Sequence, residues 1–550
     1  MARTSPRYDP CQTQPVWDEL DNLADAVRRA ASDNADSPGL IRTDVLSDVG
    51  SARMLTWREI DSAVDGAAAG LGALGLAASD GAPARVAIAL PNMPEFATAY
   101  FGTLRAGMVA VPVNPALTPR ELRHVLADSG ASVLVATDAV AAAVEGIQTD
   151  LPALKHRYVV GASFDELAAS GAAAVSTTTS GEDLAVLLYT SGTSGAPKGA
   201  MLSHRALLAN HRQVAQVDPQ IISPDDVVLL ALPLFHVFGL NSGLGAVAYH
   251  GATGVLVNRL DPAQTLDVIA EHHVSVVTGV PQMYQSWSAL PELGEHLASV
   301  RVAISGAAPL EIAVARRFLE ATRHPIFEGY GLTETAPTVA TSLASPVPKP
   351  GSIGRPVPGV EVKLVAADGA EIARASADGL LSGEAYGDDF DDDAGDAPGT
   401  DPGEVVVRGA NLFSGYWPTG ADGPDEDGWW ATGDVAYADA DGDLFLVDRL
   451  GDLILVSGFN VYPHEIELVL MAHPAVVEAA VVAVPDPTTG QAVRAYVVVA
   501  EGGSVPIEEL RAHCERNLAR FKQPSEIEFV AELPHSAIGK VRKATLRAST

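Results

Sequence analysis

The stretch Thr190-Ser191-Gly192-Thr193-Ser194-Gly195-Ala196-Pro197-Lys198-Gly199 says most about the fold and the chemistry of this chain. It follows an apolar run, residues 184–189, that predicts a buried strand. Glycines let backbone N–H groups approach an anion, hydroxyls donate hydrogen bonds, and Lys198 adds positive charge. A loop of this kind after a strand therefore favours polyphosphate binding, and a solvated flexible linker is the alternative reading.

The loop is not a Walker A motif. That motif requires Gly, four residues and then Gly-Lys-Ser/Thr, whereas Lys198 follows Pro197 and precedes Gly199. The phosphate-binding interpretation therefore depends on the strand before the loop and on motifs farther along the chain.

Length and composition limit the class of protein. A chain of 550 residues, 47% of them hydrophobic, can form several domains with ordinary cores. No apolar run reaches the ~18 residues that span a bilayer, and residues 1–10 lack the apolar core of a signal peptide. Cys11 and Cys514 have no metal-ligand spacing, which argues against a zinc site or a disulfide framework. We expect a soluble cytoplasmic protein.

The charge is strongly acidic. A net charge of −33, from 69 acidic and 36 basic residues, repels nucleic acid and anionic lipid. The excess is spread along the chain, which favours adaptation to high salt over a local acidic interaction surface. Seven of the basic residues are lysines. Because lysine is scarce here, Lys198 and Lys540, both next to glycine, are stronger functional candidates.

Salt adaptation has a testable consequence. Mutual repulsion of the carboxylates is screened at molar ionic strength, where the Debye length is ~3 Å. We expect the protein to lose activity and unfold on dialysis into low salt, followed by circular dichroism and assay. Full activity and an unchanged melting temperature in dilute buffer would contradict this expectation.

Strand-like and helix-like stretches alternate along the first half of the chain, which predicts a doubly wound α/β sheet. The expected strands are residues 86–90, 109–113, 132–136, 227–232, 254–257, 274–278 and 301–305, and the expected helices are 95–106 and 119–128.

The sequence divides into two expected domains at Arg449. Residues 1–448 form a large N-terminal domain of doubly wound α/β subdomains plus a β-rich part. Residues 388–401 contain seven aspartates and read as a solvated surface insertion, with a cation-binding loop as the less favoured alternative. Residues 449–550 form a small, mobile α+β domain. Its expected helices are residues 465–472 and 507–519, and its expected strands are residues 476–484, 492–500 and 526–530.

Seven motifs, taken together in their order and spacing, resemble the AMP-forming acyl-CoA synthetase (adenylate-forming ligase) superfamily over residues 50–545. They are Tyr189 to Gly199, Pro233-Leu-Phe-His-Val-Phe-Gly239, Ser305-Gly-Ala-Ala-Pro309, Gly329-Tyr-Gly-Leu-Thr-Glu334, Thr432-Gly-Asp434, Asp448-Arg449 with Val456-Ser-Gly-Phe-Asn-Val-Tyr-Pro463, and Gly539-Lys540. The resemblance implies a reaction in two steps. A carboxylate attacks the α-phosphate of ATP to give an acyl-adenylate and pyrophosphate, and a thiol then displaces AMP.

The resemblance also implies catalytic roles. Lys540 would offset the repulsion between the carboxylate and the phosphates in the first step. Glu334 would bind Mg²⁺, with Thr190 as a second oxygen ligand, and Thr333 would contact phosphate. His236 would position or gate the acyl carboxylate, and Lys543 is expected to be an ordinary surface or tail cation.

Further residues would bind the nucleotide and the thiol substrate. Tyr330 would stack on adenine, Asp434 would accept the ribose hydroxyls, and Arg449 would contact the ribose. Gly451 stands at the family's hinge position, often Asp or Lys, and glycine permits the hinge rotation. The expected binding set is Thr190, Ser191, Gly192, Thr193, Ser194, Gly195, Lys198, Gly306, Ala307, Ala308, Glu328, Gly329, Tyr330, Gly331, Thr333, Asp434, Arg449, Ser457, Gly458 and Lys540.

The motifs resemble those of medium- and long-chain fatty acyl-CoA ligases most closely, so the expected substrates are a fatty acid, ATP and coenzyme A, with Mg²⁺. Alternatives are an aryl (coumarate-like) acid, a carrier-protein thiol in place of coenzyme A, a luciferase-like oxidase, and a non-catalytic binding protein of the same fold. No nucleic acid partner is expected, and a homodimer is compatible with the sequence.

Overall fold

The computed structural model describes residues 20–43, 53–76, 83–169, 179–190, 197–382, 399–450, 452–456, 459–500, 505–535 and 541–548. The chain divides into two compact units. Unit 1 comprises Met1–Glu361 and Arg408–Trp430, and unit 2 comprises Val362–Val407 and Ala431–Thr550. These compact units are defined differently from the two expected domains. The domain boundary expected at Arg449 therefore stays a prediction.

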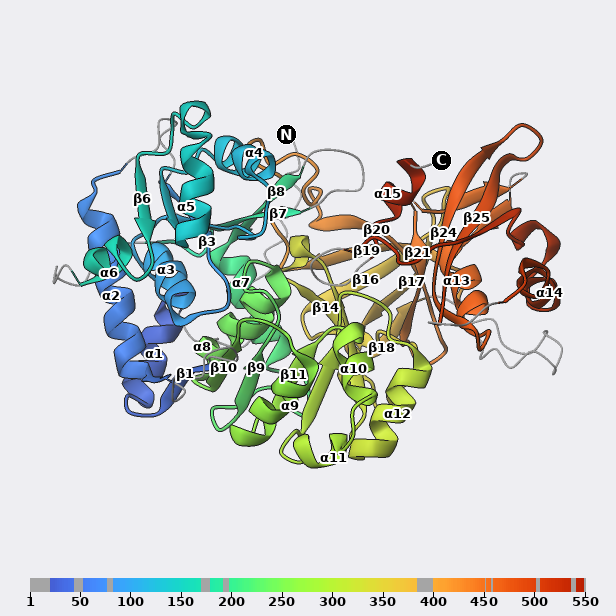
Figure 1. The fold of residues 1–550 in the computed structure, drawn as a ribbon, viewed down its shortest axis with the longest axis horizontal. Coiled ribbons are helices and arrows are strands. Elements are labelled where there is room, and N and C mark those ends of the chain that lie inside the picture. The colour runs from blue at the N-terminus through green and yellow to red at the C-terminus, as the bar shows by residue number, and fades with distance from the viewer. Residues whose placement is uncertain are drawn as a thin grey trace, which may run out of the picture. The chain divides into compact units, whose positions relative to one another are not determined.

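The first sheet of unit 1 has six strands in the order β6-β5-β3-β4-β7-β8. Figure 1 labels β3, β6, β7 and β8 of this sheet. Strands β3, β4 and β5 are buried along their whole length, as expected for parallel strands covered on both faces. The strands are β3 (Arg85–Ala89), β4 (Val109–Pro112), β5 (Val133–Ala136), β6 (His156–Val159), β7 (Leu184–Thr190) and β8 (Lys198–Ser203). The helices in the same stretch of sequence are α2 (Trp57–Ala73), α3 (Pro94–Arg105), α4 (Pro119–Ser129), α5 (Asp138–Glu145), α6 (Ser163–Ala168) and the short η1 (Gln148–Asp150).

Helix α4 matters for the site and has clear sequence signals at both ends. Thr118 and Glu121 form a capping box, in which each side chain accepts a hydrogen bond from the other residue's backbone N–H. The helix ends at Gly130 in the left-handed conformation (φ +60°).

The second sheet of unit 1 has nine strands in the order β15-β14-β13-β12-β11-β9-β10-β1-β2. Strands β1, β10, β9, β11, β12 and β13 run parallel to one another. Strand β2 pairs antiparallel with β1 at one edge, and β14 pairs antiparallel with β13 and with β15 at the other. The strands are β1 (Pro38–Thr43), β2 (Arg53–Thr56), β9 (Val227–Leu230), β10 (Thr253–Val257), β11 (Val276–Gly279), β12 (Val302–Ser305), β13 (Ile326–Gly331), β14 (Thr338–Thr341) and β15 (Arg355–Pro356).

Helices of unit 1 supply the rest of its core. Tyr284 packs edge to face against both Trp287 and Phe318, in a core cluster that includes residues of this sheet. The remaining helices are α1 (Asp25–Asp33), α7 (His204–Val214), the π-helix η2 (Phe238–Gly245), α8 (Ala246–His250), α9 (Pro262–Glu271), α10 (Pro281–Ser288), α11 (Leu293–His296), α12 (Ile312–Thr322), η3 (Thr333–Thr335) and η4 (Ser342–Ala344).

Two further sheets have most of their residues in unit 2. One has the order β18-β17-β16-β19-β20-β21 and the other β23-β22-β25-β24, with β26 parallel to β25. The strands are β16 (Val360–Val365), β17 (Glu371–Ser376), β18 (Gly379–Ser382), β19 (Gly403–Gly409), β20 (Trp429–Ala438), β21 (Leu444–Arg449), β22 (Ile454–Val456), β23 (Phe459–Val461), β24 (Val476–Asp486), β25 (Gly490–Val499) and β26 (Glu526–Phe529). The helices are α13 (Pro463–Met471), α14 (Ile507–Asn517), η5 (Arg520–Lys522) and α15 (Lys543–Ala548).

The α/β class predicted from the sequence is confirmed, and the first sheet shows why. Its central strands are short apolar runs, so their burial could be read directly from composition. The predicted loop 190–199 is wrong at its ends: Thr190 belongs to β7, and Lys198 and Gly199 belong to β8, which pairs antiparallel with β7. Most of the aspartate-rich stretch lies outside the described residues, and at its end Thr400 is buried and hydrogen-bonds Ala438 of β20.

Within the described part of the chain, no helix has the length and hydrophobicity to cross a membrane.

Candidate active site

The antiparallel pair β7–β8 places Lys198 opposite Thr190 in the register. The ammonium group of Lys198 lies 3.1 Å from a carboxylate oxygen of Asp422 and 5.0 Å from the centre of the Tyr416 ring. The Lys198 side chain is 57% exposed, so it is a positive charge that a dissolved anion can reach. Ser191, Gly192, Thr193, Ser194 and Gly195 lie outside the described residues.

Glu334 lies in η3 and is buried, and it is held by hydrogen bonds from Tyr416 and Phe413. The Tyr416 hydroxyl donates a hydrogen bond to Oε1 of Glu334 at 2.5 Å. The Glu334 carbonyl oxygen accepts a hydrogen bond from the backbone N–H of Phe413 at 2.9 Å. The structure thus brings Lys198 and Glu334, which are predicted site residues, to one tyrosine that the sequence interpretation missed.

The end of β13 carries Glu328, Gly329, Tyr330 and Gly331. Tyr330 is buried, with 8% of its surface exposed, and Glu328 is half-buried. The following residue Thr333 is half-buried at the start of η3. These residues come together because β13 runs directly into the turn that precedes Glu334.

The Gly306–Ala308 turn follows β12 and lies beside β13. A Cβ at Gly306 would lie 3.1 Å from the Phe238 ring and 3.2 Å from the Gly329 carbonyl oxygen, so the absence of a side chain permits this approach. Ala307 has a positive φ of +70°, which is uncommon for a residue with a Cβ. Phe238 therefore packs beside this turn, and the sequence interpretation did not select it as a site residue.

His236 lies two residues before the π-helix η2, which begins at Phe238. Its Nδ1 accepts a hydrogen bond from the Phe238 backbone N–H at 3.3 Å, so in the neutral ring Nε2 carries the proton. Burial lowers the pKa of His236 to about 4. The ring is therefore neutral at physiological pH and can donate one hydrogen bond from Nε2 without adding charge.

Glu328 has an unusual environment for a carboxyl group. Burial raises its pKa to about 7, against the effect of hydrogen bonds from the backbone N–H groups of Leu310 (3.4 Å) and Gly351. A raised pKa in an acid means that the neutral form is favoured in the folded protein. The Glu328 carboxyl therefore contributes to the free energy of unfolding through its neutral form. This contribution is fully present below the pKa of the unfolded chain, near 4.5, and is lost as pH rises through the folded-state pKa of about 7.

We expect Glu328→Gln to remove this pH dependence. Each pKa unit corresponds to ~1.4 kcal/mol. The free energy of unfolding of the variant, relative to that of wild type, should therefore be about 2 kcal/mol higher at pH 8.5 than at pH 5.5. Urea denaturation of both proteins at the two pH values measures this. A constant difference between the two proteins would show that the Glu328 carboxyl titrates normally.

In unit 2, the predicted ribose-binding residues contact each other. Asp434 and Arg449 are partners in the β20–β21 register, and Nε of Arg449 lies 2.8 Å from Oδ1 of Asp434. Asp434 is 5% exposed, and its N–H donates to the Thr432 hydroxyl. The arginine thus fixes the orientation of this carboxylate. Four residues of the predicted site lie outside the described residues: Ser457, Gly458, Lys540 and Gly451, the last expected at the hinge.

Lys543 corrects the expectation of an ordinary surface or tail cation. Its side chain is 17% exposed, and its ammonium group lies 2.7 Å from Oε1 of Glu467 in α13. Desolvation lowers the pKa of Lys543, but the nearby carboxylates of Glu467 and Asp448 outweigh it, so the net shift is upward. The lysine is buried because α15 packs beside β24. Its position near a chain terminus gave no sign of this.

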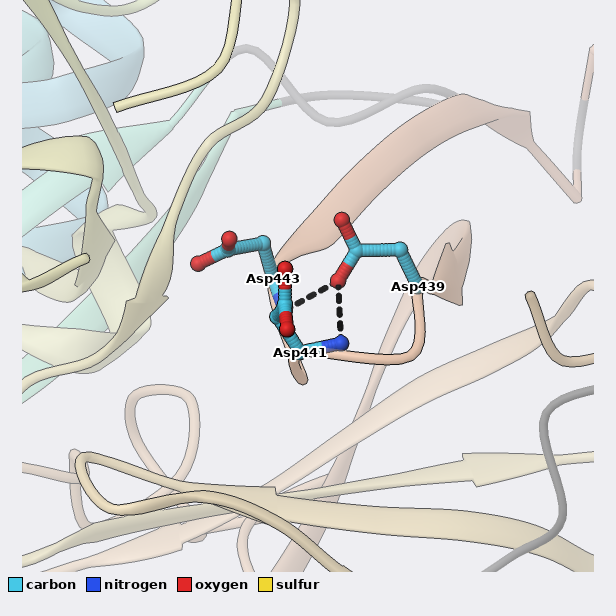
Figure 2. Close-up of side chains that lie close together, drawn as sticks. All are labelled: Asp439, Asp441 and Asp443. Carbon is cyan, nitrogen blue, oxygen red and sulfur yellow. Dashed lines mark hydrogen bonds between the residues drawn. The ribbon is translucent and has the colours of Figure 1, made fainter. Parts of the chain in front are cut away.

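Among the described residues, one acidic cluster has the spacing of metal ligands. Ligand atoms of Asp439, Asp441 and Asp443 lie within 4.8 Å of one another at the β20–β21 turn (Figure 2). Oδ1 of Asp439 accepts hydrogen bonds from the backbone N–H groups of Asp441 and Asp443, both at 3.0 Å. These bonds are ordinary turn chemistry, so we assign no metal to this cluster.

Two protein-family models and several known enzymes match this chain in sequence. A family model described as AMP-binding enzyme matches residues 27–417, and one described as AMP-binding enzyme C-terminal domain matches residues 465–540. A long-chain-fatty-acid–CoA ligase of Escherichia coli is 34% identical over 571 residues, which cover 96% of this chain and 95% of the relative. A feruloyl-CoA synthase of an Amycolatopsis species is 36% identical over 502 residues, covering 90% and 93%.

A solved structure gives the same likeness in three dimensions. The crystal structure of an anthranilate CoA ligase in complex with anthranoyl-AMP matches with a TM-score of 0.82 and 28% identity, covering 98% of each chain.

Proposed function

Because this chain belongs to the family of AMP-binding enzymes, we propose that it joins a carboxylic acid to coenzyme A, using ATP and releasing AMP and pyrophosphate. The structural observation that carries the proposal is the cluster in unit 1 in which Lys198 and Glu334 both contact Tyr416. An accessible cation beside a held carboxylate suits a nucleotide that carries a divalent cation.

In the first half-reaction, Lys198 and the Thr190–Gly195 stretch hold the triphosphate. The hydroxyl and backbone N–H groups donate to phosphate oxygens, and the lysine offsets their charge. Glu334 and the Thr190 hydroxyl are hard oxygen donors of the kind that Mg²⁺ prefers, so they would hold it. Mg²⁺ supplies charge neutralisation at the phosphates when bound.

The acyl group and adenine would lie around the Gly306–Ala308 turn and the end of β13. The neutral His236 ring can donate from Nε2 to the attacking carboxylate, which orients it without removing its nucleophilic charge. The close packing of Gly306 against Phe238 and Gly329 leaves no room for a side chain at this turn. Tyr330, Thr333 and Glu328 complete this part of the proposal.

Roles for the remaining residues rest on the family resemblance. Asp434, oriented by Arg449, would accept the ribose hydroxyls. Lys540 would neutralise charge between carboxylate and phosphate during adenylation, and Ser457 and Gly458 belong to the same nucleotide- and thiol-binding set. The C-terminal domain would then rotate about Gly451 between the first half-reaction and the second.

The substrate we propose is a medium- or long-chain fatty acid. The ligase from Escherichia coli, whose name specifies long-chain fatty acids, covers nearly the whole chain. An aryl acid is the second candidate, since the feruloyl-CoA synthase has slightly higher identity over a somewhat shorter span. A cytoplasmic location and a homodimer are part of the same proposal, and fractionation and light scattering test them.

An acid panel separates these candidates. AMP release is measured at molar KCl with ATP, Mg²⁺, coenzyme A and each acid from acetate to palmitate, plus aryl acids. Fastest turnover with acids of eight carbons or more is the expected result, and highest activity with coumarate-like acids would favour the aryl candidate. AMP release without thioester would indicate a carrier-protein thiol. Folded protein that releases no AMP with any acid would contradict the ligase proposal.

A further inference from the structure

One short segment, residues 413–417, connects three parts of the candidate nucleotide site. Its backbone pairs with β8, because Ser414 N–H donates to the Met201 carbonyl and Trp417 N–H donates to the Gly199 carbonyl. Phe413 N–H donates to the carbonyl of Glu334. The segment therefore lies between the strand that begins with Lys198 and the turn that carries Glu334.

The side chains of this segment continue the same connection. The Tyr416 hydroxyl donates a hydrogen bond to the Glu334 carboxylate at 2.5 Å, and the Lys198 ammonium lies 5.0 Å from the centre of the Tyr416 ring. The Phe413 ring packs edge to face on Tyr416, with ring centres 5.0 Å apart. One residue thus contacts both the cation and the carboxylate of the site.

Helix α4 fixes the other end of the segment. Nε1 of Trp417 donates to the Asp128 carbonyl at 2.9 Å, and the Tyr189 hydroxyl donates to the Asp128 carboxylate at 2.6 Å. The guanidinium of Arg85 lies 4.9 Å from the Trp417 ring centre. The last residues of β7 and the 413–417 segment are therefore held by the same turn of one helix.

The backbone before Tyr416 is specialised for this position. Gly415 has φ of +92°, and a Cβ there would lie 2.2 Å from the carbonyl oxygen of Gly420. Only glycine allows this conformation without strain. The Gly415 backbone therefore sets the direction in which Tyr416 leaves the chain.

From these contacts we propose that Tyr416 is a positioning residue of the nucleotide site, and the inference rests on the proposed function. Its hydroxyl occupies one lone-pair direction on Oε1 of Glu334 and leaves the other carboxylate positions for a divalent cation. A hydrogen bond to an ionised carboxylate is stronger than a neutral one, so it holds Glu334 in one rotamer. Tyr416 acts on the metal through Glu334 and does not itself contact the reacting atoms.

Tyr416→Phe tests this directly, since it keeps the ring against Lys198 and Phe413 and removes only the hydroxyl. The probe is ATP, titrated calorimetrically in MgCl₂ and again in EDTA. We expect the variant to bind ATP about tenfold more weakly than wild type in MgCl₂ and equally well in EDTA. In steady-state assays the KM for MgATP should rise, and the KM for the acid should not change.

Two further single variants and one double variant test the interpretation. Tyr284→Phe removes a buried hydroxyl that donates to the Ile304 carbonyl at 2.8 Å, and serves as the matched control with unchanged Mg²⁺ dependence. Trp417→Phe removes the bond to Asp128 and should give a smaller loss in the same direction. In a Glu334→Gln background, Tyr416→Phe should add no further loss, because the two residues act as one unit.

The outcomes separate the inference from the proposed function. Wild-type protein that shows no acid-dependent pyrophosphate release contradicts the proposed function itself. Active wild type, with Tyr416→Phe and Trp417→Phe both binding MgATP as tightly as wild type does, overturns the role of Tyr416 alone. A loss of equal size in MgCl₂ and in EDTA also overturns it, since a general packing defect has no metal dependence.

Discussion

Replacing Glu334 with glutamine should lower the rate of adenylation by about 100-fold with little change in stability. Glutamine is nearly isosteric and can still accept the Tyr416 hydroxyl through its amide oxygen, so the local packing survives. The negative charge that attracts Mg²⁺ is lost, and removing one preorganised electrostatic group at such a centre costs ~10²–10³ in rate. Single-turnover pyrophosphate release with saturating acid measures the effect.

The control for Glu334→Gln is Glu182→Gln. Glu182 is a 68% exposed glutamate of unit 1 that forms a surface ion pair with Arg205. Its replacement should leave adenylation at the wild-type rate, because exposed pairs contribute little. A Glu334→Gln rate within threefold of wild type would mean that this carboxylate does not hold the metal.

The largest expected loss of stability comes from Lys543→Met in unit 2. Glu467 is 8% exposed and accepts hydrogen bonds from Lys543 and from the Val481 backbone N–H. Removing the lysine leaves a buried carboxylate without its cation, which typically costs 3–5 kcal/mol. We expect a drop of about 3 kcal/mol in the unfolding free energy, measured by urea denaturation with fluorescence and circular dichroism.

Lys522→Met is the matched control, because Lys522 pairs with Glu465 of the same helix α13 at the same 2.7 Å. That pair is more exposed, so its loss should cost less than ~1 kcal/mol. Adding Glu467→Gln to Lys543→Met should recover part of the loss, since the buried charge is then removed as well. Equal effects of the two lysine replacements would show that burial of the Lys543 pair is energetically unimportant.

The sequence predicted the elements whose signal is local. Residues 184–189 are continuously apolar, and they form the buried strand β7 with one residue added. Strand β8 was missed, because Lys198 and Gly199 have the composition of a loop and become a strand only through pairing with β7. The π-helix η2 likewise has no local signal, as its apolar and glycine residues fit several conformations.

The candidate site follows the same division. Lys198, Glu334 and Asp434 were selected from short motifs, and the binding roles of Lys198 and Asp434 and the metal-binding role of Glu334 stay predictions. Tyr416 was missed because its partners are distant in the sequence. Glu334, for example, precedes it by 82 residues. The aromatic pair after glycine in Ser414-Gly415-Tyr416-Trp417 is the one local feature that could have drawn attention to it. Lys543 was misjudged because burial of a terminal lysine depends on the packing of α15.

The most direct test of the central claim is to look for the adenylate itself. The protein is mixed at molar KCl with ATP, Mg²⁺ and a long-chain fatty acid but no coenzyme A, and the quenched mixture is analysed by mass spectrometry. We predict one acyl-adenylate and one pyrophosphate per active enzyme, and their conversion to acyl-CoA and AMP when coenzyme A is added. ADP and inorganic phosphate as products, or thioester formation with no adenylate before it, would contradict the claim.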